Sequence, residues 1–312
     1  MRQYLVLDIG GTFIKYALMG EDGSFLESGK LPSPMDSLDS LLAAVASVGE
    51  KFRGRYEKAA VSMPGRIDTR TGMAHTGGAF PFIRETPAGQ LFAGRLGCPV
   101  MVANDGKCAA NAEAWTGALA DTADGAVLVL GTGTGGGIVL NHRIWMGHTF
   151  AAGELSFLPV RFEGLCRAFM EDVRSDGSEW MWAQYASAAG LLQLYARRKG
   201  IPMEGLDGLK FFAAYDAGEP EAAEALAAFG EMTAAGIYAI QSMLDLERYA
   251  IGGGISARPE VTDIIRAKLD GIYGAIAFTA FGKPEIVRCR YGNDANLIGA
   301  LAFHLAAAAP QL

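Results

Sequence analysis

The amino-terminal part of the chain has a strand-like pattern of hydrophobic and polar positions. Residues 4–9 form a short apolar run, and residues 12–19 and 24–29 alternate between apolar and polar positions. Runs of this length and period predict strands, and the glycines between the first two predict a tight turn. The chain is therefore expected to begin with a three-stranded meander.

A helical period follows, because apolar residues recur every three or four positions over residues 38–52. We expect further strands at 58–63 and 99–103 and a helix over 105–118. From Gly125 the first plan repeats: a strand (AVLVLG), a glycine turn (TGTGGG), an alternating strand (GIVLN) and a short strand (RIWMG). This duplication indicates two lobes facing a cleft.

The remaining segments predict helices and strands in alternation, which indicates an α/β fold. The expected helices cover 180–199, 220–244, 258–271 and 294–305, and the expected strands cover 247–251 and 285–288.

Composition narrows the function classes. The chain has 312 residues, enough for about two domains. Its net charge of −7 argues against a nucleic-acid partner. With no apolar run of 18 residues and no signal-peptide pattern, we expect a cytoplasmic protein without membrane contact. The four cysteines include no C-x-x-C pair, so we expect neither disulfides nor a structural zinc site.

The first glycine cluster lies directly after a buried strand. Gly10 and Gly11 let the backbone turn its amides outward, and Thr12 adds a hydroxyl, which together predict an anion-binding concavity. An ionised Asp8 beside a phosphate requires a cation between them, so Asp8 is a candidate indirect magnesium ligand. The alternative is a plain hairpin with an aspartate at the end of its strand.

The second cluster comprises Gly131, Thr132, Gly133, Thr134 and the glycines after them. It satisfies G-x-G-x-x-G, but a dinucleotide site needs a helix after the glycines, and residues 137–141 alternate like a strand. A hairpin that cradles phosphate fits better. No G-x-x-x-x-G-K-[ST] motif occurs.

A third cluster, residues 252–254, precedes a predicted helix and would let a flat ligand approach the backbone. Its alternative is an ordinary strand-to-helix loop. Three such clusters at strand ends together indicate a nucleotide. Asn104 and Asp105 lie where a strand ends and a helix begins, and Asp105 is either a chemical group of the site or a helix N-cap.

These segments resemble the ROK family of sugar kinases, within the actin, Hsp70 and sugar kinase (ribonuclease H-like) fold. The matching motifs, in family order, are DIGGTFIK, VSMPGRID, VANDGKCAANAEAW, LGTGTGGGIVLN, AAGELSF, AIGGGIS and NDANLIGALAF. The resemblance implies two α/β lobes around a central cleft. One would span residues 1–117, completed by a C-terminal helix at about 295–312, and the other residues 118–294.

The resemblance also implies ATP-dependent phosphorylation of a sugar hydroxyl, usually at carbon 6, by a protein that is often a homodimer. Asp105 would be the catalytic base. The sugar would be bound by Gly78, Asn104, Asp105, Glu154 and Phe157. ATP and Mg²⁺ would be bound by Asp8, Gly10, Gly11, Thr12, Lys15, Gly131, Thr132, Gly133, Thr134, Gly253, Gly254 and Ile255, with Asp8 acting on the metal indirectly.

The departures from the family pattern bear on the substrate. Only Cys166 remains of the family's zinc cysteines, so no zinc site is expected. Phe157 stands where the family has a histidine, and Ala183 where it has a glutamate. Because both positions would hold the anomeric end of the sugar, we hypothesise a substrate of glucose or a β-glucoside such as cellobiose.

Several alternatives stay open. In one alternative, Phe157 and Ala183 only repack the site of the missing zinc, and the substrate is free glucose, N-acetylmannosamine or fructose. A ROK-type transcriptional regulator is disfavoured because the first strand begins at Tyr4, with no helix-turn-helix before it. A non-catalytic sugar sensor would have no need of Asp105.

Overall fold

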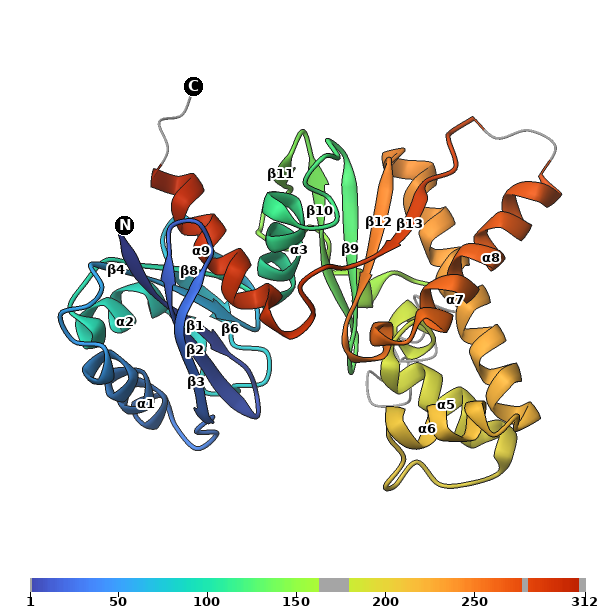
Figure 1. The fold of residues 1–312 in the computed structure, drawn as a ribbon, viewed down its shortest axis with the longest axis horizontal. Coiled ribbons are helices and arrows are strands. Elements are labelled where there is room, and N and C mark those ends of the chain that lie inside the picture. The colour runs from blue at the N-terminus through green and yellow to red at the C-terminus, as the bar shows by residue number, and fades with distance from the viewer. Residues whose placement is uncertain (1, 163–179, 277–279, 309–312) are drawn as a thin grey trace. The chain divides into compact units, whose positions relative to one another are not determined.

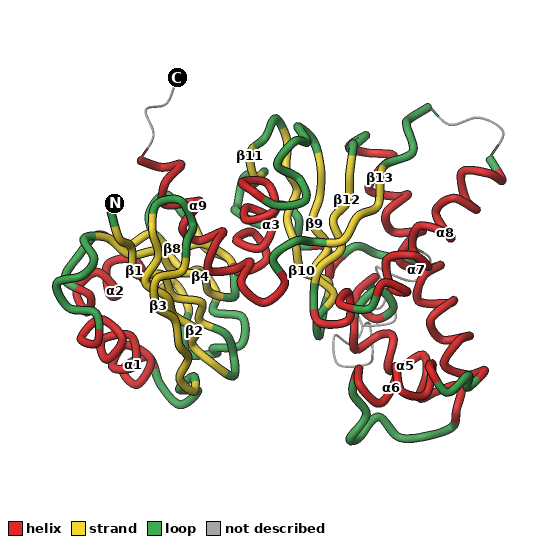
Figure 2. The backbone as a smooth tube through the Cα atoms, viewed as in Figure 1, coloured by secondary structure: helices red, strands yellow, loops and turns green. Residues whose placement is uncertain are grey.

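The computed structural model describes residues 2–162, 180–276 and 280–308 (Figures 1 and 2). Two compact units divide the described residues. Unit 1 takes them from Met1–Ala120, Gly137–Ala152 and Asn293–Leu312, and unit 2 from Asp121–Gly136 and Gly153–Gly292. Residues 137–152, assigned above to the second lobe, thus group with the first. No helix in the described ranges is long and apolar enough to cross a membrane.

A five-stranded sheet forms the centre of unit 1, in the order β3-β2-β1-β4-β8. β1 pairs antiparallel with β2 and parallel with β4, and β4 pairs parallel with β8. The carboxyl ends of β1, β4 and β8 therefore meet at one edge. The strands are β1 (Gln3–Ile9), β2 (Phe13–Gly20), β3 (Phe25–Pro32), β4 (Lys58–Met63) and β8 (Val100–Asn104).

Helices cover both faces of this sheet (Figure 1). α1 (Leu38–Lys51) and α2 (Ala88–Leu96) lie on one side, and α9 (Ala295–Ala308) lies on the other. The apolar stripe expected for α1 is confirmed, since its Leu41 and Val45 are fully buried in the core. β1 is buried along nearly its whole length, which explains why its sequence is an unbroken apolar run.

α3 (Asp105–Thr116) packs against α9 in unit 1. The two backbones approach closely at Gly299, because any Cβ there would overlap the carbonyl oxygen of Cys108. Asn111 Nδ2 donates to the carbonyl of the same glycine at 3.1 Å. The contact thus depends on a residue without a side chain.

The sequence pattern does not predict three very short strands of unit 1. β5 (Ile67–Asp68), β6 (Met73–Thr76) and β7 (Arg84–Thr86) form a small antiparallel sheet. Strands of two to four residues are too short for a two-residue period to be recognised. The sequence pattern also does not predict α2 or, in unit 2, α6 (Gly208–Asp216), which are only nine residues long each.

The second five-stranded sheet has the order β11-β10-β9-β12-β13, which repeats the plan of the first. β12 pairs parallel with β9 and with β13. The α/β class expected from the alternating pattern is confirmed. The strands are β9 (Gly125–Leu130), β10 (Thr134–Leu140), β11 (Arg143–Ile144), β12 (Arg248–Gly252) and β13 (Glu285–Arg288).

Helices and short 3₁₀ turns complete the described chain. The α-helices formed by the described residues of unit 2 are α5 (Ala188–Lys199), α6, α7 (Pro220–Leu244) and α8 (Pro259–Ala275). The 3₁₀ turns are η1 (Leu155–Phe157), η3 (Trp182–Gln184), η4 (Gly254–Ala257) and η5 (Gly292–Asp294).

The helix expected from residue 180 begins only at Ala188, where the Ser187 hydroxyl caps it by accepting from the amide of Gly190. Before it, Trp182 is fully buried in unit 2 and its Nε1 donates to the carbonyl of Met232 at 2.8 Å. Gly236 leaves the space that the indole fills. Trp182 is therefore a core residue.

Candidate active site

The glycine turn of unit 1 is held by its carbonyl groups. The amide of Gly10 donates to the carbonyl of Phe13 at 3.0 Å, which closes the turn. The carbonyls of Gly10 and Thr12 accept from the hydroxyl and the amide of Ser33. Gly11 and Thr12 are exposed, and their amides have no backbone acceptor within the described residues. This geometry leaves amides available to an anion.

Asp8 is the second-last residue of β1, two residues before Gly10 of this turn, and is only 5% exposed. Its Oδ1 accepts from the Ser62 hydroxyl at 2.9 Å and from Asn296 Nδ2 at 3.0 Å. Its Oδ2 lies 3.8 Å from Lys15 Nζ, which also donates to the carbonyl of Asn293 at 3.1 Å. Burial raises the pKa of Asp8, and these hydrogen bonds and the charge of Lys15 oppose that rise.

Asn104 and Asp105 end β8 and begin α3 at the same edge of the sheet. Asn104 is the helix N-cap, since its Oδ1 accepts from the amide of Lys107 at 3.0 Å. Its Nδ2 donates to Asp105 Oδ1 at 3.0 Å and to the carbonyl of Gly65 at 2.9 Å. The capping role considered for Asp105 thus belongs to its neighbour, and Asn104 is 6% exposed with its amide group engaged inside the protein.

The loop that carries Gly78 lies beside both of these groups. Gly65 has φ of +103°, and a Cβ there would overlap the carbonyl of Thr76, so only glycine fits where the two loop segments meet. Gly78 is exposed and lies against Pro64 and Gly65. A Cβ on Gly11 would lie 3.3 Å from Ala79 Cβ. Unit 1 therefore brings Asp8, the glycine turn, Asn104, Asp105 and Gly78 into one region.

The glycine loop of unit 2 is tied to two other segments. The carbonyl of Gly131 accepts from the amide of Ala188, at the start of α5, at 2.9 Å. The amide of Thr134 donates to the Ser156 hydroxyl at 3.0 Å. Thr132 is exposed, whereas Thr134 is buried and its hydroxyl donates to the carbonyl of Ala186 at 2.6 Å. Thr134 thus supports the loop from inside the fold.

The third glycine cluster lies against the second. Gly253 has φ of +93°, and a Cβ there would overlap the carbonyl of Leu130 at the end of β9. Gly254 is exposed, with open space where a side chain would be. Ile255 is buried and faces Gly208, at the start of α6. A flat ligand would therefore meet backbone at Gly254, with Ile255 supporting the turn from below.

Glu154 and Phe157 belong to the same region of unit 2, because Ser156 between them accepts from Thr134. Glu154 is exposed and precedes η1, and Phe157 ends it with 70% of its side chain exposed. Ala183 is half-buried in η3. A phenylalanine that repacks the interior would be buried, so the exposure of Phe157 favours a role at the surface of the site.

The donor set for a metal ion is sparse. Within the described residues no group of three or more histidine, cysteine, aspartate or glutamate side chains is arranged to hold one. Asp8 by itself suits Mg²⁺, which keeps several waters and takes one or two carboxylates together with phosphates. Cys166 and most of the segment that replaces the family's zinc cysteines lie outside the described residues.

Four residues that support the site were not predicted from the sequence: Ser33, Ser62, Ser156 and Asn296. Ser62, Ser156 and Asn296 fall inside matched motifs, but nothing in their spacing shows that they contact Asp8 or the glycine loop.

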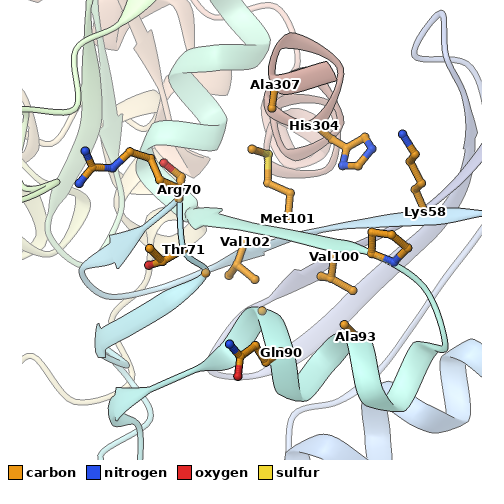
Figure 3. Close-up of a pocket in the computed structure, with 14 residues that line it drawn as sticks. Lys58, Arg70, Thr71, Gln90, Ala93, Val100, Met101, Val102, His304 and Ala307 are labelled. Carbon is orange, nitrogen blue, oxygen red and sulfur yellow. The ribbon is translucent and has the colours of Figure 1, made fainter. Parts of the chain in front are cut away.

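A separate pocket of unit 1 contains none of the expected site residues (Figure 3). It lies along β8 between α2 and α9, and Met101 points toward α9 whereas Val100 and Val102 point toward α2. Lys58 and His304 lie next to each other at its rim. It begins at the amino end of the strand whose carboxyl end carries Asn104.

The fold and the site together define a class of α/β proteins that contain two glycine hairpins, one in each of two similar sheets, and a carboxylate where a helix begins. The ROK family model matches residues 4–307, and the chain belongs to this family. A β-glucoside kinase of Klebsiella pneumoniae is 31% identical over 295 residues, covering 94% of this chain and 93% of that protein.

Two solved structures share the fold. A ROK family protein from Streptococcus pneumoniae in complex with sucrose has a TM-score of 0.83 at 26% identity, covering 98% of this chain and 99% of that one. A ROK family glucokinase from Streptomyces griseus in complex with glucose and AMPPNP has a TM-score of 0.80 at 25% identity, covering 96% and 98%. The two-lobed sugar kinase fold expected from the motifs is thereby confirmed.

Proposed function

We propose that the protein is an ATP-dependent sugar kinase that phosphorylates the 6-hydroxyl of glucose or of a β-glucoside. The observation that carries this proposal is the pair of carboxylates at one edge of the unit 1 sheet. Asp8 is the second-last residue of β1 and Asp105 follows β8, with β4 between these strands. Strands lie about 4.8 Å apart, so the two backbones are separated by roughly 10 Å and the carboxylates suit different tasks.

Asp105 is the proposed catalytic base. Its Oδ1 accepts from Asn104 Nδ2 and from the amide of Gly106 at 2.8 Å, and it lies in the first turn of α3, where the helix dipole interacts favourably with negative charge. A carboxylate fixed in this way can align the attacking hydroxyl and accept its proton late in the transfer. Phosphoryl transfer has a loose transition state, so positioning and charge neutralisation supply most of the catalysis.

Asp8 and Lys15 are proposed to serve the phosphates of ATP. When bound, Mg²⁺ would neutralise the charge that develops on the transferred phosphoryl group. Asp8 would hold it through water with Oδ2, since its Oδ1 already accepts two hydrogen bonds. The amides of Gly11 and Thr12 and the ammonium group of Lys15 would bind phosphate oxygens.

The unit 2 residues are proposed to hold the rest of ATP and part of the sugar. The loop from Gly131 to Gly133 would bind phosphate, and Gly254 would lie against the base. Glu154 would accept a hydrogen bond from a sugar hydroxyl. The Streptomyces griseus glucokinase, which shares the fold and is in complex with glucose and AMPPNP, supports the binding of a sugar and of ATP.

We propose that the sugar substrate carries a substituent on carbon 1. The exposed ring of Phe157 offers an apolar face for a second sugar ring or an aglycone. A short ribbon holds the segment after it, since the amide of Val160 donates to the carbonyl of Trp180 and that of Trp182 to the carbonyl of Leu158, both at 2.8 Å. The Klebsiella relative, a β-glucoside kinase, and the sucrose complex support this choice.

A coupled assay of ADP release tests the proposal with glucose, cellobiose, fructose and N-acetylmannosamine, each with ATP and Mg²⁺. We expect turnover of cellobiose at a kcat/KM at least equal to that of glucose. Turnover of monosaccharides alone would reject the β-glucoside, and the absence of ADP release with every sugar would reject the kinase.

The Phe157→Ala variant tests the aromatic contact. We expect kcat/KM for cellobiose to fall about five-fold, the worth of one aromatic contact, with the value for glucose nearly unchanged. Phe25→Ala is the matched control, because Phe25 is an exposed phenylalanine on β3. Equal losses for both sugars would remove Phe157 from the recognition of carbon 1.

The partners are also proposed. We expect the protein to be a homodimer, and sedimentation equilibrium would measure its molar mass in solution. No nucleic-acid partner is expected, because the net charge is −7. A specific gel shift at physiological salt would instead favour the regulator branch of the family.

A further inference from the structure

We propose that Asn296 is a positioning residue that fixes the carboxylate of Asp8 in the orientation needed to hold the magnesium of ATP. The proposal rests on the proposed function and adds to it a role for the C-terminal helix. Asn296 lies in the first turn of α9, 288 positions along the chain from Asp8.

The two carboxylate oxygens of Asp8 have different partners. Oδ1 accepts from Asn296 Nδ2 at 3.0 Å and from the Ser62 hydroxyl at 2.9 Å, so it is held by two neutral donors. Oδ2 lies 3.8 Å from the ammonium group of Lys15. Two donors on one oxygen fix the rotation of the carboxylate, which directs Oδ2 toward Lys15 Nζ.

The same segment also holds Lys15. Its Nζ donates to the carbonyl of Asn293 at 3.1 Å, three residues before Asn296. Residues 293–296 thus contact both charged side chains proposed to meet the phosphates. Lys15 supplies the ion pair that the described residues give Asp8, and the buried thiol of Cys108 on α3 also lies near Asp8.

α9 is itself fixed against the helix that carries Asp105. Gly299 lies one turn after Asn296 and touches the backbone of Cys108 in α3, so little sliding is possible between the two helices. Asn296 is therefore supported by a rigid contact, and a substitution there changes the carboxylate rather than the helix. The chain offers a matched control in Asn111, whose Nδ2 bonds Gly299 across the same helix pair and not Asp8.

A double-mutant cycle tests the contact without any catalysis. The unfolding equilibrium constant is measured by urea denaturation of the metal-free protein for wild type, Asn296→Ala, Asp8→Ala and the double variant. We expect the effect of Asn296→Ala to differ about five-fold between the wild-type background and the Asp8→Ala background, since residues in direct contact are coupled. Asn111→Ala should have the same effect in both backgrounds. Additive effects for Asn296 would overturn the proposal.

Kinetics then test the role in magnesium use. For Asn296→Ala we expect the Mg²⁺ concentration for half-maximal rate to rise about ten-fold and kcat to fall, while KM for the sugar stays within two-fold. Asn111→Ala should leave the Mg²⁺ requirement unchanged. A loss in Asn296→Ala that appears only in the sugar KM would overturn the positioning role. If the wild type shows no kinase activity, the proposed function is wrong. The contact between Asn296 and Asp8 is still tested in that case, because the coupling in the metal-free protein is measured without any activity.

Discussion

The side chain of Asn104 caps the helix that Asp105 begins and also donates to the Asp105 carboxylate, with Nδ2 and Oδ1 3.0 Å apart. One amide group therefore sets both the start of α3 and the orientation of the proposed base. Because Asp105 does not cap the helix with its own side chain, its carboxylate can be changed without removing the cap.

The first prediction concerns Asp105→Asn. We expect kcat to fall by at least ~100-fold, the scale for loss of an acid-base group, while calorimetry still detects ATP and sugar binding. The asparagine keeps an oxygen that accepts from Asn104 and Gly106, so the fold should be retained. Asp39→Asn is the control, because Asp39 is also an acidic residue in the first turn of a helix. Full activity of the Asp105 variant would exclude it as the base.

The second prediction concerns the stability of Asp8→Asn. Burial raises the pKa of Asp8 in the folded protein. A group with a raised folded pKa favours folding most when it is protonated, and this contribution is lost as pH rises through the folded pKa. We therefore expect the metal-free Asp8→Asn variant to have a higher unfolding free energy than wild type at pH 7.5, and a smaller increase near pH 4. In the presence of ATP, Mg²⁺ and sugar, its kcat should fall on the order of 100-fold.

Urea denaturation at the two pH values measures this gain. Asparagine is nearly isosteric with aspartate, so a change in packing does not enter the comparison. A variant that is less stable than wild type at pH 7.5 would show that the ionised carboxylate stabilises the fold.

The third prediction concerns the contact between α3 and α9. We expect Gly299→Ala to lower the unfolding free energy by about 1–3 kcal/mol, because the new Cβ overlaps the carbonyl of Cys108 and the backbones must separate. Gly271→Ala in α8 is the matched control. It has open space at its Cβ, and alanine there should raise the unfolding free energy by about 0.5–1 kcal/mol. Similar effects for the two variants would mean that the helices adjust freely.

The fourth prediction concerns His304 at the rim of the pocket along β8 (Figure 3). Burial, and secondarily the charge of Lys58, lowers the pKa of this imidazole, and its ring lies 5.4 Å from that of Tyr4. The unfolded chain therefore binds a proton more readily, so stability should fall as pH drops below the ordinary histidine value of about 6.5.

His304→Phe keeps a ring against Tyr4 and removes the proton site. We expect its unfolding free energy to depend less on pH than that of wild type between about pH 7 and pH 5. Parallel curves for the two proteins would mean that His304 does not contribute to acid sensitivity.

The sequence alone determined the elements that are long and periodic. The continuous apolar run of β1, the stripe of α1 and the repeated glycine turns predicted the duplicated α/β plan, and the motifs around Asp8 and Asp105 indicated the family. These features are local, because a period or a turn requires only residues near each other in the chain. β5, β6 and β7 were missed because each pairs too few residues to leave a period.

Tertiary structure decided which of several suitable side chains takes each role. Asn104 and Asp105 are both good caps, and the fold gives the cap to Asn104. Thr132 and Thr134 carry the same hydroxyl, but only Thr134 faces a buried carbonyl, that of Ala186. The bond from Asn296 to Asp8 joins residues 288 positions apart. Such choices depend on contacts between segments distant in sequence, which neither propensity nor spacing encodes.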